Sequence, residues 1–186
     1  VTSPDEFSAL LRVYCTYPLA ELVVHARTMK ELYRGDIHAE AFAEAFRSCP
    51  FPVTINGNLT SVSQIQAAKN EYPTLERVMI GRGLVSDPAL GLRLSGRAPS
   101  PDEYGKTLGR FLSELTETYR VRFGNDRAVL FRMKEIWRYL LDLFPDDGSA
   151  AKRFRKAATL SQLEAVSRSV LDGMEPNPIP ETYPVN

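Results

Sequence analysis

Pro52-Val53-Thr54-Ile55-Asn56-Gly57-Asn58 is a short apolar run, rich in β-branched residues, that ends in Asn-Gly. Such a run predicts a buried strand over residues 52–56 that ends at the glycine. Similar runs at residues 21–25 and 77–81 predict two more strands. Helical patterns lie between the three runs. This alternation predicts an α/β fold with parallel strands and crossover helices.

The helical patterns of the first half begin at recognisable caps. Ser3-Pro4-Asp5-Glu6 is typical of a capping box with proline in the first turn, and it predicts a helix that ends near Tyr14. Further helices are expected over residues 39–47 and 61–70, and Asp87-Pro88 is expected to open another short one.

After residue 96 the strand patterns stop. A second capping box at Ser100 opens a helix that is predicted to end near residue 123. Apolar residues at three- and four-residue spacing predict an amphipathic helix over residues 127–144, with Trp137 in the core. Two shorter helices are expected over residues 149–157 and 159–171. The domains are therefore predicted as 1–96 (α/β), 97–173 (all-α) and a proline-rich tail at 174–186.

The net charge of the chain is zero, with 23 basic and 23 acidic side chains among 186 residues. This balance excludes a histone-like polycation, and 44% hydrophobic residues exclude a disordered chain. The charge is nevertheless uneven, because residues 97–171 hold 14 basic and 10 acidic side chains. A basic excess in one segment favours an anionic partner for that segment.

Two cysteines and the lack of a long apolar run limit the class of protein. No apolar stretch approaches the roughly 18 residues of a membrane span, and no secretory leader is visible. Cys15 and Cys49 lack the spacing of metal ligands, so we expect two buried thiols and no metal site. These features predict a cytoplasmic protein that does not bind membranes.

Unusual polar residues follow all three predicted strands. His25-Ala26-Arg27, Asn56-Gly57-Asn58 and Gly81-Arg82-Gly83 each come at or directly after a strand's carboxyl end. Parallel α/β folds bind ligands at that edge, and glycine-rich backbone with an arginine suits phosphate. Each motif alone is also typical of a turn or of a structural histidine. The three together at one edge favour a ligand site.

These strings resemble the tRNA-dihydrouridine synthase family. His25-Ala26-Arg27-Thr28, with Tyr33-Arg34-Gly35 after it, is similar to the family's His-x-Arg-Thr…Tyr-x-Gly segment. The run over residues 52–58 resembles its Pro-Val-x-x-Asn-Gly strand. Val78-Met79-Ile80-Gly81-Arg82-Gly83, followed by Asp87-Pro88, resembles its Val-Met-Ile-Gly-Arg-Gly…Asn-Pro segment.

The resemblance implies a flavoenzyme that uses FMN and NADPH to reduce the C5–C6 bond of uridines in tRNA. It implies that His25 lies beside the flavin ring, and that Arg27 and Tyr33 face the substrate uridine. It further implies a set of residues around the FMN phosphate: Asn56, Gly57, Asn58, Gly81 and Arg82. Asn58 departs from the family, which usually has an acidic residue there.

The family's Asn-x-Gly-Cys-Pro motif, which carries the catalytic cysteine, does not occur in this sequence. Neither Cys15 nor Cys49 has that context, and the family's flavin-contacting lysine is also missing. We therefore expect the C-terminal part of an FMN-binding (β/α)₈ TIM barrel, with three βα units present, followed by an all-α helical bundle. Such a fragment is expected to be inactive alone, and the N-terminal half of the barrel is a possible partner.

The basic segment is predicted to contact tRNA. Arg132-x-Lys134 before Trp137 is similar to the family's tRNA-contacting helix, and backbone recognition of folded RNA suits a basic helical face. The expected tRNA-binding residues are Arg132, Lys134, Arg138, Tyr139, Lys152 and Arg155.

Two other functions remain open on the sequence. One is a different FMN-dependent barrel oxidoreductase, resembling a dihydroorotate dehydrogenase, although the basic helical segment argues against it. The other is a non-enzymatic RNA-binding module that keeps a degenerate half-barrel.

Overall fold

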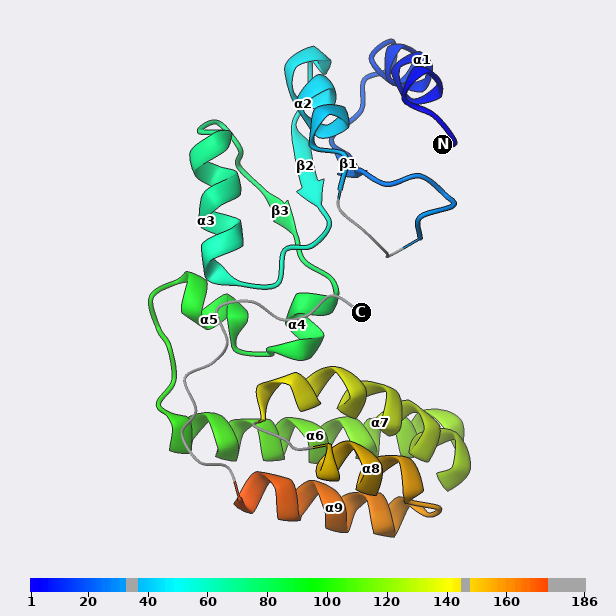
Figure 1. Cartoon of the computed structure of the whole chain (residues 1–186), viewed down its shortest axis with the longest axis vertical. Helices are drawn as coiled ribbons and strands as arrows, with labels where there is room; N and C mark the ends of the chain where they lie inside the picture. Colours follow the sequence, from blue (N-terminus) through cyan, green and yellow to red (C-terminus); the bar gives the residue numbers. More distant parts are fainter. Residues whose placement is uncertain (33–36, 145–147, 174–186) are drawn as a thin grey trace. The chain divides into compact units, whose positions relative to one another are not determined.

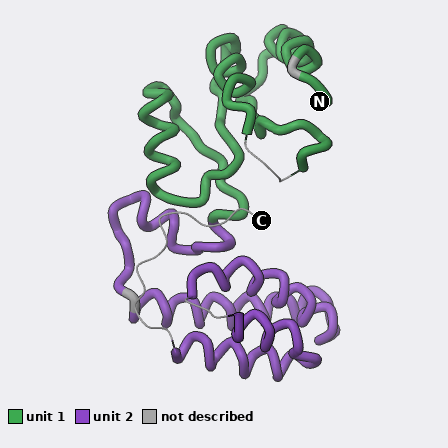
Figure 2. Tube along the Cα trace, viewed as in Figure 1, with its two compact units in different colours: residues 1–83, 182–186 green, residues 84–181 purple. Residues whose placement is uncertain are grey.

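The structure is a computed structural model that describes residues 1–32, 37–144 and 148–173 (Figure 1). The chain divides into two compact units, one built from residues 1–83 and the other beginning at residue 84 (Figure 2). Residues 84–96 thus group with the helical unit, although the sequence pattern assigns them to the α/β part. The functional domain assignment stays a prediction, and the tail at 174–186 lies outside the described residues.

The first unit contains a three-stranded parallel sheet, as the alternating pattern predicts. Its strands are β1 (Leu22–His25), β2 (Val53–Asn56) and β3 (Val78–Met79), in the order β1-β2-β3. The register pairs His25 with Asn56 and Asn56 with Met79. β3 is shorter than the predicted run over residues 77–81.

Three helices accompany this sheet: α1 (Pro4–Tyr14), α2 (Ala39–Ser48) and α3 (Val62–Glu71). The hydroxyl oxygens of Ser3 and Ser61 accept hydrogen bonds from N–H groups in the first turns of α1 and α3. At α1 the Glu6 carboxylate accepts from Thr2 rather than completing the predicted box. α2 packs against β1 and β2.

The two faces of the sheet differ in burial. Val24, Val53 and Ile55 are buried on one face. On the other face Val23 is 44% exposed and Met79 is 50% exposed. Parallel sheets are normally covered on both faces. In the described part of the chain, the face that carries Val23 and Met79 is left with exposed apolar side chains.

The second unit is helical, as predicted. Its elements are α5 (Leu90–Leu94), α6 (Pro101–Phe123), α7 (Asp126–Leu140), η1 (Leu141–Leu143), α8 (Ser149–Lys156) and α9 (Leu160–Asp172). α6 begins with the complete capping box that the sequence predicts, in which Ser100 and Glu103 bond reciprocally. Trp137 is fully buried and stacks on Phe154 at 4.3 Å between ring centroids, so its predicted core position is confirmed.

The helices differ from the prediction in one boundary and in one additional element. The helix expected over residues 127–144 ends at Leu140, because the chain tightens into a 3₁₀ turn and Phe144 is extended. A short helix, α4 (Arg82–Ser86), forms directly after β3 where none was predicted.

A buried carboxylate ties the start of the second unit to α6. Asp87 is 1% exposed, and its oxygens accept hydrogen bonds from Ala89 N–H, the Tyr104 hydroxyl and Arg93 Nε at 2.9–3.0 Å. Because a buried charge needs such partners, this network explains why residues 84–96 group with the helices.

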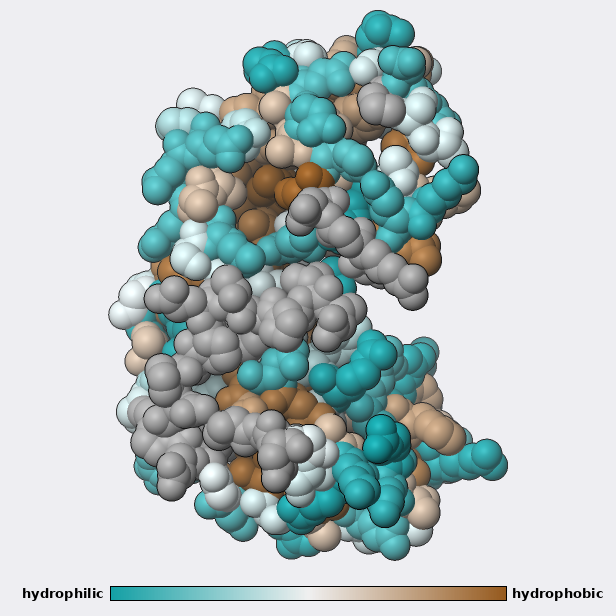
Figure 3. All heavy atoms as spheres, in the orientation of Figure 1, coloured by the Kyte–Doolittle hydropathy of each residue, from teal (hydrophilic) through white to brown (hydrophobic). Residues whose placement is uncertain are grey.

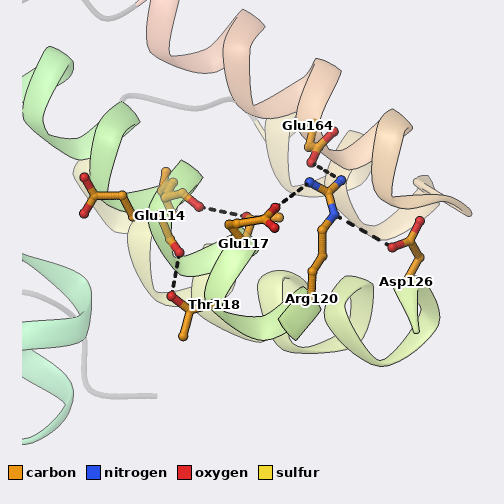
Figure 4. A network of polar contacts seen from close by, with 8 residues as sticks. Glu114, Glu117, Thr118, Arg120, Asp126 and Glu164 are labelled. Carbon is orange, nitrogen blue, oxygen red and sulfur yellow. Dashed lines mark hydrogen bonds and ion pairs between the residues drawn. The ribbon is translucent and has the colours of Figure 1, made fainter. Parts of the chain in front are cut away.

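A second polar cluster joins three helices of this unit (Figure 4). The Arg120 guanidinium on α6 lies 2.9 Å from Glu164 on α9, 3.4 Å from Glu117 and 3.8 Å from Asp126 at the start of α7. These partners are partly exposed, so the cluster orients the helices more than it stabilises them.

Hydrophilic residues cover much of the face seen in Figure 3, with apolar patches between them. Within the described ranges, none of the helices combines the length and the hydropathy that crossing a lipid bilayer requires.

Candidate functional site

The carboxyl ends of the three strands meet at one edge of the sheet, and a single side chain links them. His25 Nδ1 lies 2.6 Å from Asn56 Oδ1, across the β1–β2 pair. Asn56 Nδ2 donates a hydrogen bond to the carbonyl oxygen of Met79 at 2.9 Å, across the β2–β3 pair. Two of the predicted site residues, His25 and Asn56, are therefore in direct contact.

A second polar contact joins the segments that follow β1 and β2. Arg27 Nη2 donates to Asn58 Oδ1 at 3.0 Å, and Arg27 is only 8% exposed. The resemblance implies that Arg27 faces the substrate; in this structure its side chain is buried and bound to Asn58. Tyr33, the other residue expected to face the uridine, lies outside the described residues.

The backbone after β2 needs glycine. Gly57 has φ +118°, which side chains rarely adopt, and a Cβ there would lie 3.0 Å from Ile37 Cγ2 and 3.6 Å from the His25 ring. Asn58 follows with φ +51°, a left-handed conformation that asparagine tolerates. These two residues turn the chain sharply beside His25 and keep the turn next to the strand ends.

Gly83 holds the loops after β2 and β3 close together. A Cβ at this position would lie 2.6 Å from the Leu59 carbonyl oxygen and 2.9 Å from Thr60 Cα. At Gly81, by contrast, a Cβ would meet nothing within 4 Å. The site residues inferred from the sequence include Gly81 but not Gly83, although the Gly-Arg-Gly string contains both. Arg82, the first residue of α4, is partly exposed.

An ion pair fixes the turn that follows β1. Glu31 carboxylate oxygens accept hydrogen bonds from Thr28 N–H at 2.7 Å and from the Thr28 hydroxyl, and they lie 2.9 Å from His38 Nε2. The Thr28 N–H, together with His38, lowers the pKa of Glu31 to about 2. The Glu31 carboxylate in turn raises the pKa of His38.

A cavity of about 310 Å³ lies beside this turn. Its lining includes His25, Arg27, His38, Glu44 and Arg47. Charged side chains and apolar groups line this cavity together.

The two cysteines lie away from the strand-end edge. Cys15 and Cys49 cap the C-terminal ends of α1 and α2, with 3.8 Å between their sulfur atoms. Each is half-buried, so the expectation of two buried thiols is wrong. Burial, with the neighbouring Cys15, raises the pKa of Cys49 to about 12, so its thiol is not activated.

The residues predicted to contact tRNA fall on α7 and α8, which pack together through Trp137 and Phe154. Some of the predicted residues have partners within the unit. Arg132 pairs with Glu135 at 2.9 Å, and Lys134 Nζ donates to the Arg155 carbonyl oxygen at 3.0 Å.

Other basic residues of α7 and α8 form no ion pair with a carboxylate in the part of the chain that the structure describes. Arg138 donates to the Tyr139 hydroxyl at 3.2 Å, which leaves its charge in place. Over the described ranges, no carboxylate forms an ion pair with four exposed cations of α8: Lys152, Arg153, Arg155 and Lys156.

Comparison with known proteins identifies the family. The model for the dihydrouridine synthase (Dus) family matches residues 8–160. This chain belongs to the dihydrouridine synthase family. The match runs from α1 to the start of α9, so it includes both the strand-end edge and the basic helices.

Curated relatives of the dihydrouridine synthase family agree with this assignment. The chain is 34% identical over 140 residues to the tRNA-dihydrouridine(16) synthase of Ralstonia nicotianae, covering 68% of the chain and 43% of the relative. It is 31% identical over 158 residues to the protein of the same name from Pseudomonas putida, covering 82% and 49%. It is 26% identical over 154 residues to the tRNA-dihydrouridine synthase B of Shewanella oneidensis. The chain spans less than half the length of these relatives.

The resemblance drawn from the three strand-end motifs is thus confirmed. Family membership implies that the parallel sheet is a portion of a TIM barrel. That architecture explains the exposed Val23 and Met79, because one face of a barrel strand points into the barrel interior.

Proposed function

We propose that this chain is part of a tRNA-dihydrouridine synthase, which reduces the C5–C6 bond of a uridine in tRNA with FMN as cofactor and NADPH as reductant. One observation carries the proposal. The three motif segments that resemble the family end at a single sheet edge, where Asn56 bonds to both His25 and Met79. Position 16 is the first uridine to examine, since several relatives carry that number in their name.

The strand-end edge would hold FMN. Asn56, Gly57, Asn58, Gly81 and Arg82 would surround its phosphate, and His25 would lie beside the ring. The local structure supports this assignment, because Gly83 lets the loops after β2 and β3 approach closely and the space beside Gly81 is open. The bound flavin would supply the hydride for the uracil ring.

The chain's own residues would position the cofactor and exclude water. The Asn56 amide holds His25 in place, and the Arg27–Asn58 hydrogen bond links the two neighbouring segments. The two contacts fix these side chains relative to one another, an arrangement that would let the edge position a ligand with little rearrangement.

The proton donor would come from outside these residues. Cys15 and Cys49 sit at helix C-termini, which precede the strands, whereas His25 and Asn56 sit at the strands' carboxyl ends. We propose that the rest of the barrel, including the family's cysteine, completes the enzyme, and that this chain alone is inactive and retains little FMN. Flavin absorbance of the purified chain near 450 nm tests the latter; stoichiometric FMN would contradict it.

The exposed cations of α7 and α8 would bind the tRNA backbone. Arg138, Lys152 and Arg155 are the best candidates, because their charges have no carboxylate partner in the described structure. Arg132 would contribute less, since Glu135 pairs with it, whereas Lys134 keeps its charge but is held at the Arg155 carbonyl oxygen. Tyr139 would position Arg138.

Deletion of the gene that encodes this chain tests the proposal. We expect dihydrouridine at one position of cytoplasmic tRNA to disappear, as measured by mass spectrometry of tRNA fragments. A plasmid that carries the gene should restore it. Unchanged dihydrouridine would contradict the proposal.

A non-enzymatic RNA-binding module is the second candidate, because the exposed cations of α8 would serve RNA binding without any catalysis. Unchanged dihydrouridine together with salt-dependent tRNA binding by the chain would support it. A flavin oxidoreductase of small molecules would instead bind no tRNA.

A further inference from the structure

Phe131 is an exposed aromatic residue on α7, a helix whose other large apolar side chains mostly face the core. The apolar core residues Val129, Leu130, Met133 and Trp137 are at most 6% exposed, whereas Phe131 is 59% exposed. A single exposed apolar side chain is ordinary in itself. Its surroundings distinguish this one.

Phe131 lies within a stripe of cations. Arg127, Phe131, Lys134 and Arg138 are spaced i, i+4, i+7 and i+11, so they share one face of α7. The Arg127 guanidinium lies 5.9 Å from the centroid of the Phe131 ring, within the range of a cation–π contact. A basic stripe interrupted by an accessible aromatic ring is typical of surfaces that bind nucleic acid.

The stripe continues onto α8. Lys134 Nζ donates to the Arg155 carbonyl oxygen at the C-terminal end of α8, where Arg153, Arg155 and Lys156 are exposed. Cations are favourable at a helix C-terminus, which accounts for Arg153, Arg155 and Lys156 on α8 but not for the exposed Phe131 ring on α7. Figure 3 shows apolar and hydrophilic side chains next to each other over the end of the unit where α6 and α7 meet.

Four acidic residues of the helical unit pair with arginines that lie outside the stripe. Glu135 pairs with Arg132, which lies on a different flank of α7. Asp126, Glu117 and Glu164 surround Arg120 (Figure 4). Among the described residues, none of the ion pairs therefore neutralises Arg127 or Arg138.

We propose that Phe131 stacks on an unpaired base of tRNA while Arg127, Arg138 and the cations of α8 contact the adjacent phosphates. This inference rests on the proposed function only in taking tRNA as the ligand. The ring supplies a sequence-tolerant stacking surface, and unstacked bases of loops are what proteins read in folded RNA. The surrounding charge supplies affinity without sequence information.

Binding of a fluorescein-labelled tRNA transcript to the full chain tests this assignment. Phe131→Leu keeps an apolar side chain but removes the π-face, and it is expected to weaken binding roughly 5- to 100-fold. Phe131→Trp keeps the face and is expected to bind within about twofold of the parent. Neither change alters charge, so the slope of log affinity against log salt should stay the same. Val121→Ala, at an 81% exposed apolar position on α6, is the matched control and should bind as the parent does.

The outcomes separate the inference from the proposed function. Parent-like binding by Phe131→Leu, or equal losses in the Leu and Trp variants, would overturn stacking and leave tRNA binding intact. A parent chain that binds no tRNA at low salt would overturn both. Self-association that Phe131→Leu abolishes, with tRNA affinity unchanged, would show that the ring contacts protein and would also overturn the proposal.

Discussion

The strand-end edge of the first unit and the α7–α8 face of the second unit use polar residues in opposite ways. At the edge, His25 contacts Asn56 and the buried Arg27 contacts Asn58, so the side chains fix one another. On the helical face, Lys152 and Arg155 are exposed and stand apart from carboxylates in the described structure. The first arrangement suits a small ligand with defined geometry, and the second suits a large polyanion. Substitutions should therefore act cooperatively at the edge and additively on the face.

The largest effect is expected at Gly83. In Gly83→Ala the new Cβ would lie 2.6 Å from the Leu59 carbonyl oxygen, a backbone atom that cannot move away cheaply. We expect a loss of about 1–3 kcal/mol in the free energy of unfolding, measured by urea denaturation. Gly81→Ala is the matched control, since its Cβ meets nothing within 4 Å. Equal stability of the two variants would show that the loops do not pack as described.

Asn56→Ala should have the next largest effect. It removes the hydrogen bond to His25 and the one to the Met79 carbonyl oxygen, so the three strand ends lose their common partner. We expect a loss of about 1–2 kcal/mol in unfolding free energy. Asn56→Asp keeps an acceptor for His25 but sets a carboxylate oxygen against the Met79 carbonyl oxygen, so it should not restore the stability of the parent. A parent-like Asn56→Ala would remove the evidence for a preorganised edge.

Lys152→Gln and Arg155→Gln test additivity on the helical face. Each should weaken tRNA binding a few-fold and lower the salt slope by about one, and the double variant should show the sum. Arg132→Gln should change less, because Glu135 already pairs with Arg132. A loss for one single variant as large as that for the double variant would argue for a cooperative site on this face too.

The smallest effect concerns the Glu31–His38 pair. The raised pKa of His38 stabilises the turn below the ordinary histidine pKa, and this contribution is lost as pH rises through the raised value. The pKa of Glu31 is lowered to about 2, so the ionised carboxylate stabilises the turn above the ordinary pKa of 4.5. This stabilisation is lost as pH falls toward 2. The Thr28 amide should therefore be best protected near pH 5–6, with His38→Gln as control, as measured by hydrogen exchange. Protection that does not fall between pH 6 and 9 would contradict the pair.

The sequence predicts the order of the strands and of the longer helices, and it predicts that His25 and Asn56 end neighbouring strands at one sheet edge, because strand patterns, caps and glycines are local signals. It does not predict that α7 ends at Leu140, since the apolar spacing continues through the 3₁₀ turn to Phe144. The Arg27–Asn58 contact joins residues 31 positions apart, and no local pattern shows whether an arginine turns inward. Gly83 and Phe131 are visible in the sequence, but a close backbone approach and an exposed ring become evident only in three dimensions.

The most direct test of the central claim is the dihydrouridine content of tRNA in a deletion strain that carries variants of this gene. The parent gene and Val13→Ala, at a 51% exposed position on α1, should restore dihydrouridine. His25→Ala, with protein levels equal by immunoblot, should not restore it. Full restoration by His25→Ala would contradict the assignment of the strand-end edge to the flavin site.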